Sequence, residues 1–216
     1  MLLQKEREII VEFGKKLIET GLVKGTGGNL SLCNPEKSML AITPTGLTYE
    51  TMEPEDVVVL ALDGEQVDGK LKPSSEVTFH LGLVNLRPDI FAVVHTHSPH
   101  ASTMAYLGVA LPAIHYLVGF AGESVPVAPY ATYGTPELSG HICSSIGNGN
   151  AVFMANHGMV AVGANMARAF TTAEMVEYVA QLYLQAKAVG NPQILSKAEM
   201  DVVIGKFETY GQPSLK

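Results

Sequence analysis

Short apolar runs joined by very tight turns constrain the fold of this chain more than any other feature. Residues 151–155 and 159–162 are two such runs, and only residues 156–158 separate them. A third run, 57–62, ends at 63–64, an Asp-Gly pair that favours a hairpin turn. Because parallel neighbours need a long crossover connection, these turns predict a sheet that is mixed or largely antiparallel.

Helical patterns alternate with the apolar runs. Apolar spacing predicts helices over 2–20 and 165–189, and capping signals at 73–76, 135–137 and 196–199 begin three more. Further strands are predicted at 30–32, 39–43, 90–94 and 125–129. We therefore expect an α/β fold in which helices flank a central, mainly antiparallel sheet, as a single domain over residues 1–216.

Composition excludes several classes of protein. With 47% apolar residues the chain can fill a sizeable core, and its net charge of −7 argues against a general affinity for nucleic acid. No apolar run approaches the roughly 18 residues of a membrane span, and the charged N-terminal residues show no signal-peptide core. The two cysteines, Cys33 and Cys143, make no disulfide framework. We expect a cytoplasmic protein without membrane or nucleic-acid partners.

The pair His95 and His97 follows the apolar run 90–94, which is rich in β-branched and aromatic residues. Side chains two positions apart on a strand point to the same face, so both imidazoles should emerge side by side where the strand ends. Two adjacent imidazoles are suitable ligands for one transition metal. Such pairs also occur on strands without a metal, so the spacing alone leaves both interpretations open.

Two further residues could complete a catalytic centre. His157 lies in the turn between two apolar strands, where a third nitrogen ligand would leave an open position typical of catalytic zinc. Glu76 opens a predicted helix and could serve as a general base or an extra ligand, or be an ordinary helix-terminal glutamate. The other central histidines are expected elsewhere: His80 and His141 on helices or the surface, and His100 pointing away beyond Pro99.

Three loops offer neutral donors that could hold an anion. They contain, in order, Asn29 after two glycines, the pair Thr45-Gly46, and the pair Ser74-Ser75 at a helix start. Each loop is a weak signal alone, because glycine-rich turns are usually only turns. Their presence in one chain with the histidines raises the expectation of a phosphate site.

Taken together, these motifs resemble the class II aldolase/adducin family. The matching segments are Gly27-Gly28-Asn29-Leu30-Ser31, Thr45-Gly46, Pro73-Ser74-Ser75-Glu76, His95-Thr96-His97 and Asn156-His157-Gly158, in that order. Residues 130–135 and 206–211 favour the members that act on L-fuculose 1-phosphate. The resemblance spans nearly the whole chain and implies a fourfold homotetramer with active sites between subunits.

The resemblance also implies a role for each matched residue. His95, His97 and His157 correspond to the ligands of one Zn²⁺ per subunit, Glu76 to the acid/base carboxylate, and Asn29, Thr45, Gly46, Ser74 and Ser75 to the phosphate-binding positions. Tyr116 corresponds to a tyrosine that acts in the neighbouring subunit, while Tyr133, Phe207 and Tyr210 correspond to residues that close over the aldehyde end. Thr45 and Tyr133 depart from the serine and phenylalanine expected there.

The activity implied by the resemblance is that of a zinc-dependent lyase. It would cleave a ketose 1-phosphate, with L-fuculose 1-phosphate as the expected substrate, to dihydroxyacetone phosphate and L-lactaldehyde. One alternative on the same scaffold is 4-epimerisation of L-ribulose 5-phosphate, or another sugar-phosphate lyase reaction. An alternative of a different class is a non-catalytic, adducin-like interaction domain.

Overall fold

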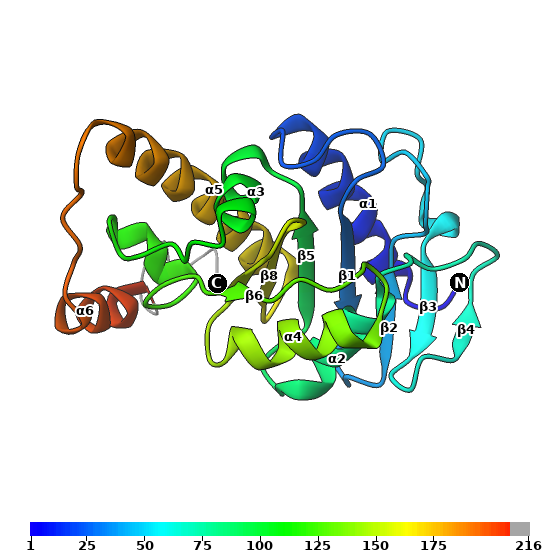
Figure 1. The fold of residues 1–216 in the computed structure, drawn as a ribbon. Coiled ribbons are helices and arrows are strands. Elements are labelled where there is room, and N and C mark those ends of the chain that lie inside the picture. Colours follow the sequence, from blue (N-terminus) through cyan, green and yellow to red (C-terminus); the bar gives the residue numbers. More distant parts are fainter. Residues whose placement is uncertain (208–216) are drawn as a thin grey trace.

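A computed structural model describes residues 1–207, which fold around one eight-stranded sheet (Figure 1). The strands are β1 Asn29–Cys33, β2 Met39–Ile42, β3 Val58–Ala61, β4 Gln66–Asp68, β5 Ala92–Thr96, β6 Val127–Ala128, β7 Ala151–Met154 and β8 Gly158–Gly163. Their order across the sheet is β4-β3-β2-β1-β5-β8-β7-β6. Among the described strands only β6 and β7 run parallel, so the predicted mainly antiparallel sheet is confirmed.

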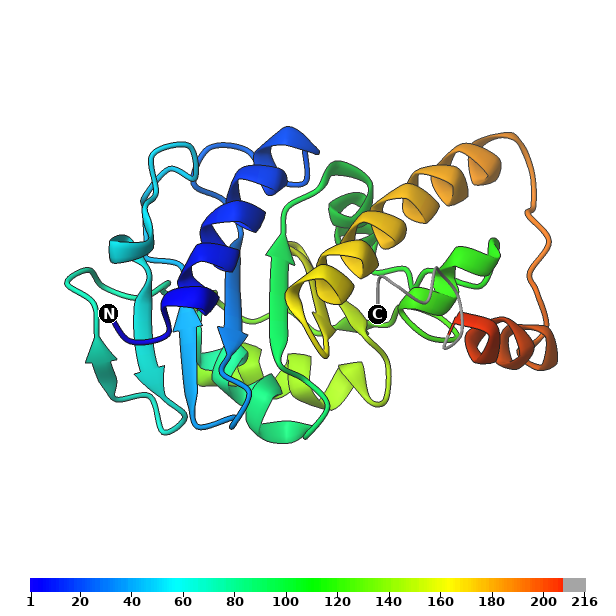
Figure 2. The same cartoon turned by 180° about the vertical axis from the view of Figure 1, so that it is seen from behind.

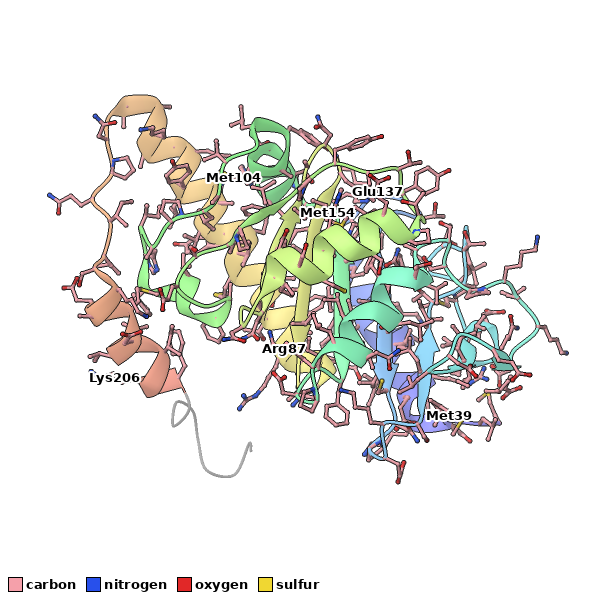
Figure 3. All side chains as sticks on the ribbon, turned by 60° about the horizontal axis from the view of Figure 1, so that its bottom comes forward. Met39, Arg87, Met104, Glu137, Met154 and Lys206 are labelled. Carbon is pink, nitrogen blue, oxygen red and sulfur yellow. The ribbon has the colours of Figure 1, made fainter. Side chains whose placement is uncertain are left out.

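Helices cover both faces of this sheet. The α-helices are α1 Gln4–Glu19, α2 Val77–Leu86, α3 Pro99–Leu107, α4 Pro136–Ile146, α5 Met166–Val189 and α6 Lys197–Phe207; two short 3₁₀ helices are η1 Pro54–Asp56 and η2 Tyr116–Phe120. The long helices α1 and α5 lie across one face (Figure 2). On the other face α2 and α4 lie side by side, with Arg87 directly beyond the end of α2 (Figure 3).

The alternation of side chains along the central strands divides the core in two. Leu30, Leu32 and Val94 belong to the larger cluster, which includes apolar side chains of α1 and α5. Val93 and Val160 belong to the second cluster, with side chains from α2 and α4. Each central strand is therefore apolar on both faces, as expected of a sheet covered on both sides.

The strand register brings three candidate site residues, Asn29, His95 and His157, to one end of the central strands. Asn29, the first residue of β1, pairs with His95 near the end of β5. On the opposite side of β5, His95 pairs with Val160 of β8, which follows three residues after His157. Residues far apart in sequence thus meet where β5 ends and where β1 and β8 begin.

Two helices and one strand differ from expectation. The sequence pattern predicts no helix at α3 or η2, although Pro99 at the start of α3 and Gly108 at its end are typical helix boundaries. The predicted strand 125–129 pairs with β7 only over Val127 and Ala128. Prolines on both sides of this pair, Pro126 and Pro129, have no N–H for the ladder, which accounts for its short length.

Of the three predicted capping signals two are confirmed, whereas α2 begins after Glu76 without a side-chain cap. Thr135 accepts a hydrogen bond from the Leu138 backbone N–H, and Ser196 and Glu199 form the reciprocal bonds of a capping box. Within residues 1–207, no helix combines the length and apolar character needed to cross a lipid bilayer.

Candidate metal centre

Three imidazoles converge at the edge where β5 ends. Ring nitrogens of His95, His97 and His157 all lie within 4.8 Å of one another. The strand geometry explains the first two: they are two residues apart at the end of β5, and their Nε2 atoms face each other at 2.9 Å. The predicted side-by-side arrangement of this pair is therefore observed, and the third imidazole joins it as expected.

The ring of His95 is oriented by a backbone hydrogen bond. Its Nδ1 donates to the carbonyl oxygen of Met159 at 2.9 Å, which leaves the lone pair of Nε2 directed at the centre. His97 Nε2 faces this lone pair at 2.9 Å, so a proton or a cation must lie between the two nitrogens. His95 is fully buried, while His97 is exposed, so the cluster opens to solvent on the His97 side.

Two glycines allow the backbone to close around these rings. Gly158 follows His157, and a Cβ at this position would overlap Thr96 O and the ring of His97. Gly28 has φ +72°, and a Cβ there would lie 2.5 Å from the carbonyl oxygen of His95. Larger residues at either position would push the strands apart and displace the imidazoles. The glycines of the two sequence motifs thus have a packing role.

Glu76 lies directly against the histidines. It immediately precedes α2, and its Oε2 lies 3.2 Å from His95 Nε2 while its Oε1 lies 3.4 Å from His157 Nε2. Among the described residues, Oε1 has no hydrogen-bond partner although it is buried. A buried carboxylate oxygen without a partner is costly unless a ligand or cation completes it.

The electrostatics of the cluster favour neutral imidazoles around a charged carboxylate. Burial, together with the neighbouring His95, lowers the pKa of His97 and of His157 to about 4. Burial opposes ionisation of Glu76, but His95, His157 and the amide of Asn29 outweigh it and hold the pKa of this carboxyl well below its usual value. Neutral imidazoles and ionised carboxylates are the forms of these groups that bind metals.

This donor set suits a transition metal. Three imidazole nitrogens beside one carboxylate match the ligands of catalytic zinc, and the exposed side at His97 leaves room for a further ligand. A bound cation would give the buried Oε1 of Glu76 a partner, and it would separate the facing nitrogens of His95 and His97. The residues therefore fit a divalent ion.

His80 was missed as a member of the site. Its expected place on a helix is confirmed, but the expectation of a surface position is wrong, since His80 is fully buried on α2. It lies one helical turn after Glu76 and contacts Ser31 and Asn29 of β1. The spacing of four from Glu76 was a usable signal. The other exclusions hold: His100 bonds to Glu177 and His141 to Pro129 O.

The predicted phosphate-binding residues come from loops that the fold brings together. An isolated β-bridge joins Pro44 to Pro73, which places Thr45 and Gly46 beside the loop of Ser74 and Ser75. The loop members Thr45, Gly46 and Ser75 are exposed, whereas Ser74 and Asn29 are buried. Ser74 Oγ accepts a hydrogen bond from the Glu76 backbone N–H, which links this loop to the centre. Their binding of phosphate stays a prediction.

The predicted aromatic residues lie apart from these contacts. Tyr116 is half exposed and stacks on His115, and Phe207 stacks on Phe120 near it. Tyr133 is 65% exposed on the loop before α4. Tyr210 lies outside the described residues. The catalytic and closing roles of these residues stay predictions.

Comparisons with known proteins agree with this geometry. The family described as "Class II Aldolase and Adducin N-terminal domain" matches residues 8–184. A 5-deoxy-D-ribulose 1-phosphate aldolase of Bacillus thuringiensis is 52% identical over 98% of this chain and 100% of its own length. An L-fuculose phosphate aldolase of Escherichia coli is 42% identical over 94% of both chains. The solved structure of an L-fuculose 1-phosphate aldolase, also 42% identical, superposes with a TM-score of 0.93 over 94% of this chain and 96% of its own.

Proposed function

Because the chain belongs to the class II aldolase and adducin family and is a metal-dependent sugar-phosphate aldolase, we propose that it cleaves a deoxyketose 1-phosphate between C3 and C4. The products are dihydroxyacetone phosphate and a short aldehyde. The observation that carries this proposal is the convergence of His95, His97 and His157 beside Glu76.

We assign the three imidazoles as the ligands of one divalent ion, with zinc as the metal. Neutral imidazole nitrogens are ligands that zinc prefers. When bound, such an ion supplies a Lewis acid that draws electron density from the ketose oxygens. The carboxylate of Glu76, 3.2 Å from His95, balances part of the added positive charge until the ketose arrives.

Glu76 moves the proton at C3. Its carboxylate is ionised in the free protein, so it must gain a proton before it can give one. The proton comes from the C4 hydroxyl of the bound ketose, which must lose it as the C3–C4 bond breaks, and Glu76 then gives it to C3. Oε1 is the candidate atom, since it has no other hydrogen-bond partner among the described residues. Proton transfers of this kind typically contribute about 10²–10⁴-fold to a rate.

Proton exchange at the C4 oxygen is assigned to Tyr116 of a neighbouring subunit, whose phenol would hydrogen-bond to this oxygen while its proton leaves. Its side chain is half exposed and packs on His115 rather than on the histidine centre of its own chain. An exposed phenol of this kind is available to another copy of the chain. We propose that active sites lie between subunits of a homotetramer.

The phosphate is assigned to the neutral donors of the three loops. Thr45, Gly46 and Ser75 are exposed, and the bridge between Pro44 and Pro73 holds their two loops together. Hydroxyl and backbone N–H donors can hold a phosphate in a protein whose net charge is −7. The aldehyde end would then face Tyr133 and Phe207.

Two substrates deserve the first assays, because they differ only at the aldehyde end. The 52% identical relative is named for 5-deoxy-D-ribulose 1-phosphate, which splits into dihydroxyacetone phosphate and acetaldehyde. The 42% identical relative is named for L-fuculose phosphate, which yields L-lactaldehyde instead. We rank 5-deoxy-D-ribulose 1-phosphate first, and L-fuculose 1-phosphate second.

The test is a product assay with and without a chelator. Triose phosphate release is measured for both ketose 1-phosphates and for L-ribulose 5-phosphate, on the purified protein, the chelated protein, and the chelated protein with added zinc. We expect release of triose phosphate from at least one ketose 1-phosphate, loss of this release on chelation and its recovery with zinc.

Chelator-resistant cleavage would refute the metal assignment. Epimerisation of L-ribulose 5-phosphate without triose release from any substrate would refute the aldolase reaction. A metal-free, inactive protein would favour the interaction-domain alternative.

A further inference from the structure

A continuous chain of buried hydrogen bonds runs from Ser31 to Glu76 beside the histidine centre. Ser31 Oγ lies 2.7 Å from His80 Nδ1, and His80 Nε2 lies 2.5 Å from Asn29 Oδ1. Asn29 Nδ2 then donates to Glu76 Oε2 at 2.9 Å. Ser31 and His80 are fully buried, and Asn29 and Glu76 nearly so. Water therefore does not compete for these bonds, and each group depends on its neighbour in the chain.

The direction of every hydrogen bond in this chain follows from the amide of Asn29. Its NH₂ group faces the carboxylate of Glu76 and donates to Oε2. Asn29 Oδ1 then faces His80 Nε2, which must carry the hydrogen. His80 Nδ1 is left as an acceptor, and the hydroxyl of Ser31 donates to it. Burial holds His80 neutral, with a pKa lowered to about 3, as this arrangement requires.

We propose that His80 is a positioning residue that locks the amide of Asn29 and, through it, the carboxylate of Glu76. The proposal rests on the proposed function, in which Glu76 moves a proton. If the amide turned over, its oxygen would face the carboxylate and the two would repel. In the observed orientation one amide N–H anchors Glu76 Oε2, and the second N–H stays available for the substrate phosphate.

Packing makes His80 suitable for this role. Its ring stacks on Phe79 with centroids 4.6 Å apart, which restricts rotation of the imidazole. Both ring nitrogens are already engaged, by Ser31 and by Asn29. His80 makes no hydrogen bond to His95, His97 or His157, so its effect on the centre passes through Asn29 and Glu76 rather than through the metal ligands.

A matched pair of substitutions tests the donor. His80→Gln keeps an N–H near the position of Nε2, whereas His80→Met has a similar length and no donor. We expect His80→Met to lower kcat by about 10- to 100-fold, the usual range for partners that orient a site, while bound metal stays at the wild-type level. His80→Gln should recover most of that loss. Equal losses in both variants, or no loss in either, would overturn the proposal.

A double-mutant cycle separates positioning from general packing. In a Glu76→Gln background the carboxylate is already lost, so adding His80→Met should lower kcat by less than about threefold. If His80 only supported the fold, the two losses would multiply. A multiplied loss therefore contradicts the proposal, and a reduced loss supports it.

A measurement without turnover tests the proton arrangement in the wild-type protein. Nitrogen-15 NMR of the histidine rings distinguishes the two neutral tautomers, and we expect His80 to carry its hydrogen on Nε2. Hydrogen on Nδ1, or a doubly protonated ring at neutral pH, would overturn the proposal even if cleavage is observed. If instead no ketose 1-phosphate is cleaved, the proposed function fails while the tautomer still reports on the amide lock.

Discussion

The histidine centre and the aromatic rim formed by Tyr116, Phe120 and Phe207 are built in opposite ways. At the centre, the polar groups contact one another: His95 bonds to Met159 O, and Glu76 lies against His95. On the rim, Tyr116 is half exposed beside an apolar hollow of about 630 Å³ between η2 and α6. In the first region, the three imidazoles and the carboxylate of Glu76 all come from a single chain. The other presents aromatic surface outward, which is typical of a surface that meets a partner.

The largest expected effect tests the assignment of the three imidazoles as metal ligands. His97→Ala removes one of three nitrogen ligands, so bound metal should fall to near zero by elemental analysis. Loss of the Lewis acid, worth several kcal/mol, should lower cleavage by at least about 10³-fold. His141→Ala is the matched control, because its ring bonds only to Pro129 O outside the centre. Full metal content in His97→Ala would contradict the assignment of His97 as a metal ligand.

A middle-sized effect tests the rim. Tyr116→Phe removes one hydroxyl that is half exposed, so folding and metal content should stay unchanged. Cleavage should fall by about 10²-fold, as expected for loss of a group that assists proton transfer at the C4 oxygen. Tyr130→Phe, on another exposed tyrosine, serves as the control and should retain full activity.

A mixture of two variants, each with low activity, tests whether Tyr116 acts in the site of a neighbouring subunit. A His97→Ala chain retains Tyr116, and a Tyr116→Phe chain retains the histidine centre. Co-expressed in one assembly, they should recover cleavage well above either variant alone, provided that each site takes its tyrosine from a neighbour. Isolated mixed assemblies without recovery would show that Tyr116 serves no neighbouring site.

Local sequence patterns were sufficient for most of the centre. Strand parity places His95 and His97 on one face, and a short turn holds His157 at the same edge. Glu76 was found because it precedes a helix, although the helix begins one residue later, at Val77. These features depend on neighbours in sequence and on the register of adjacent strands.

The remaining features depend on tertiary placement. The burial of His80 follows from the packing of α2 over Ser31 and Asn29, which no local periodicity reveals. Helix α3 escaped prediction because its central residues Ser102 and Thr103 are weak helix formers. The proposed role of Tyr116 involves a second chain, so the contacts within one chain do not test it.

The smallest expected effect is a pH dependence of stability in the metal-free protein. The pKa of His157 is lowered to about 4 in the folded chain, against about 6.5 when unfolded. Between these values the unfolded chain binds a proton that the folded chain does not, so stability falls as pH drops through this window. The slope from one imidazole is at most about 1.4 kcal/mol per pH unit. Urea denaturation between pH 6.5 and pH 4.5, above the window in which Glu76 protonates, measures it.

One substitution in each region tests whether the pH dependence of stability arises from the imidazoles of the centre. His157→Gln removes one of several buried imidazoles whose pKa is lowered, so it should reduce the slope by up to about 1.4 kcal/mol per pH unit while His97 and His80 keep their contributions. Tyr116→Phe leaves every imidazole in place and should keep the wild-type slope. The carboxyl of Glu76 acts in a lower window: its pKa is depressed, so its contribution is present above its ordinary pKa and is lost only below it. Equal slopes in wild type and His157→Gln would mean that this imidazole carries no proton linkage to folding, and the contrast between the buried centre and the exposed rim would then not extend to His157.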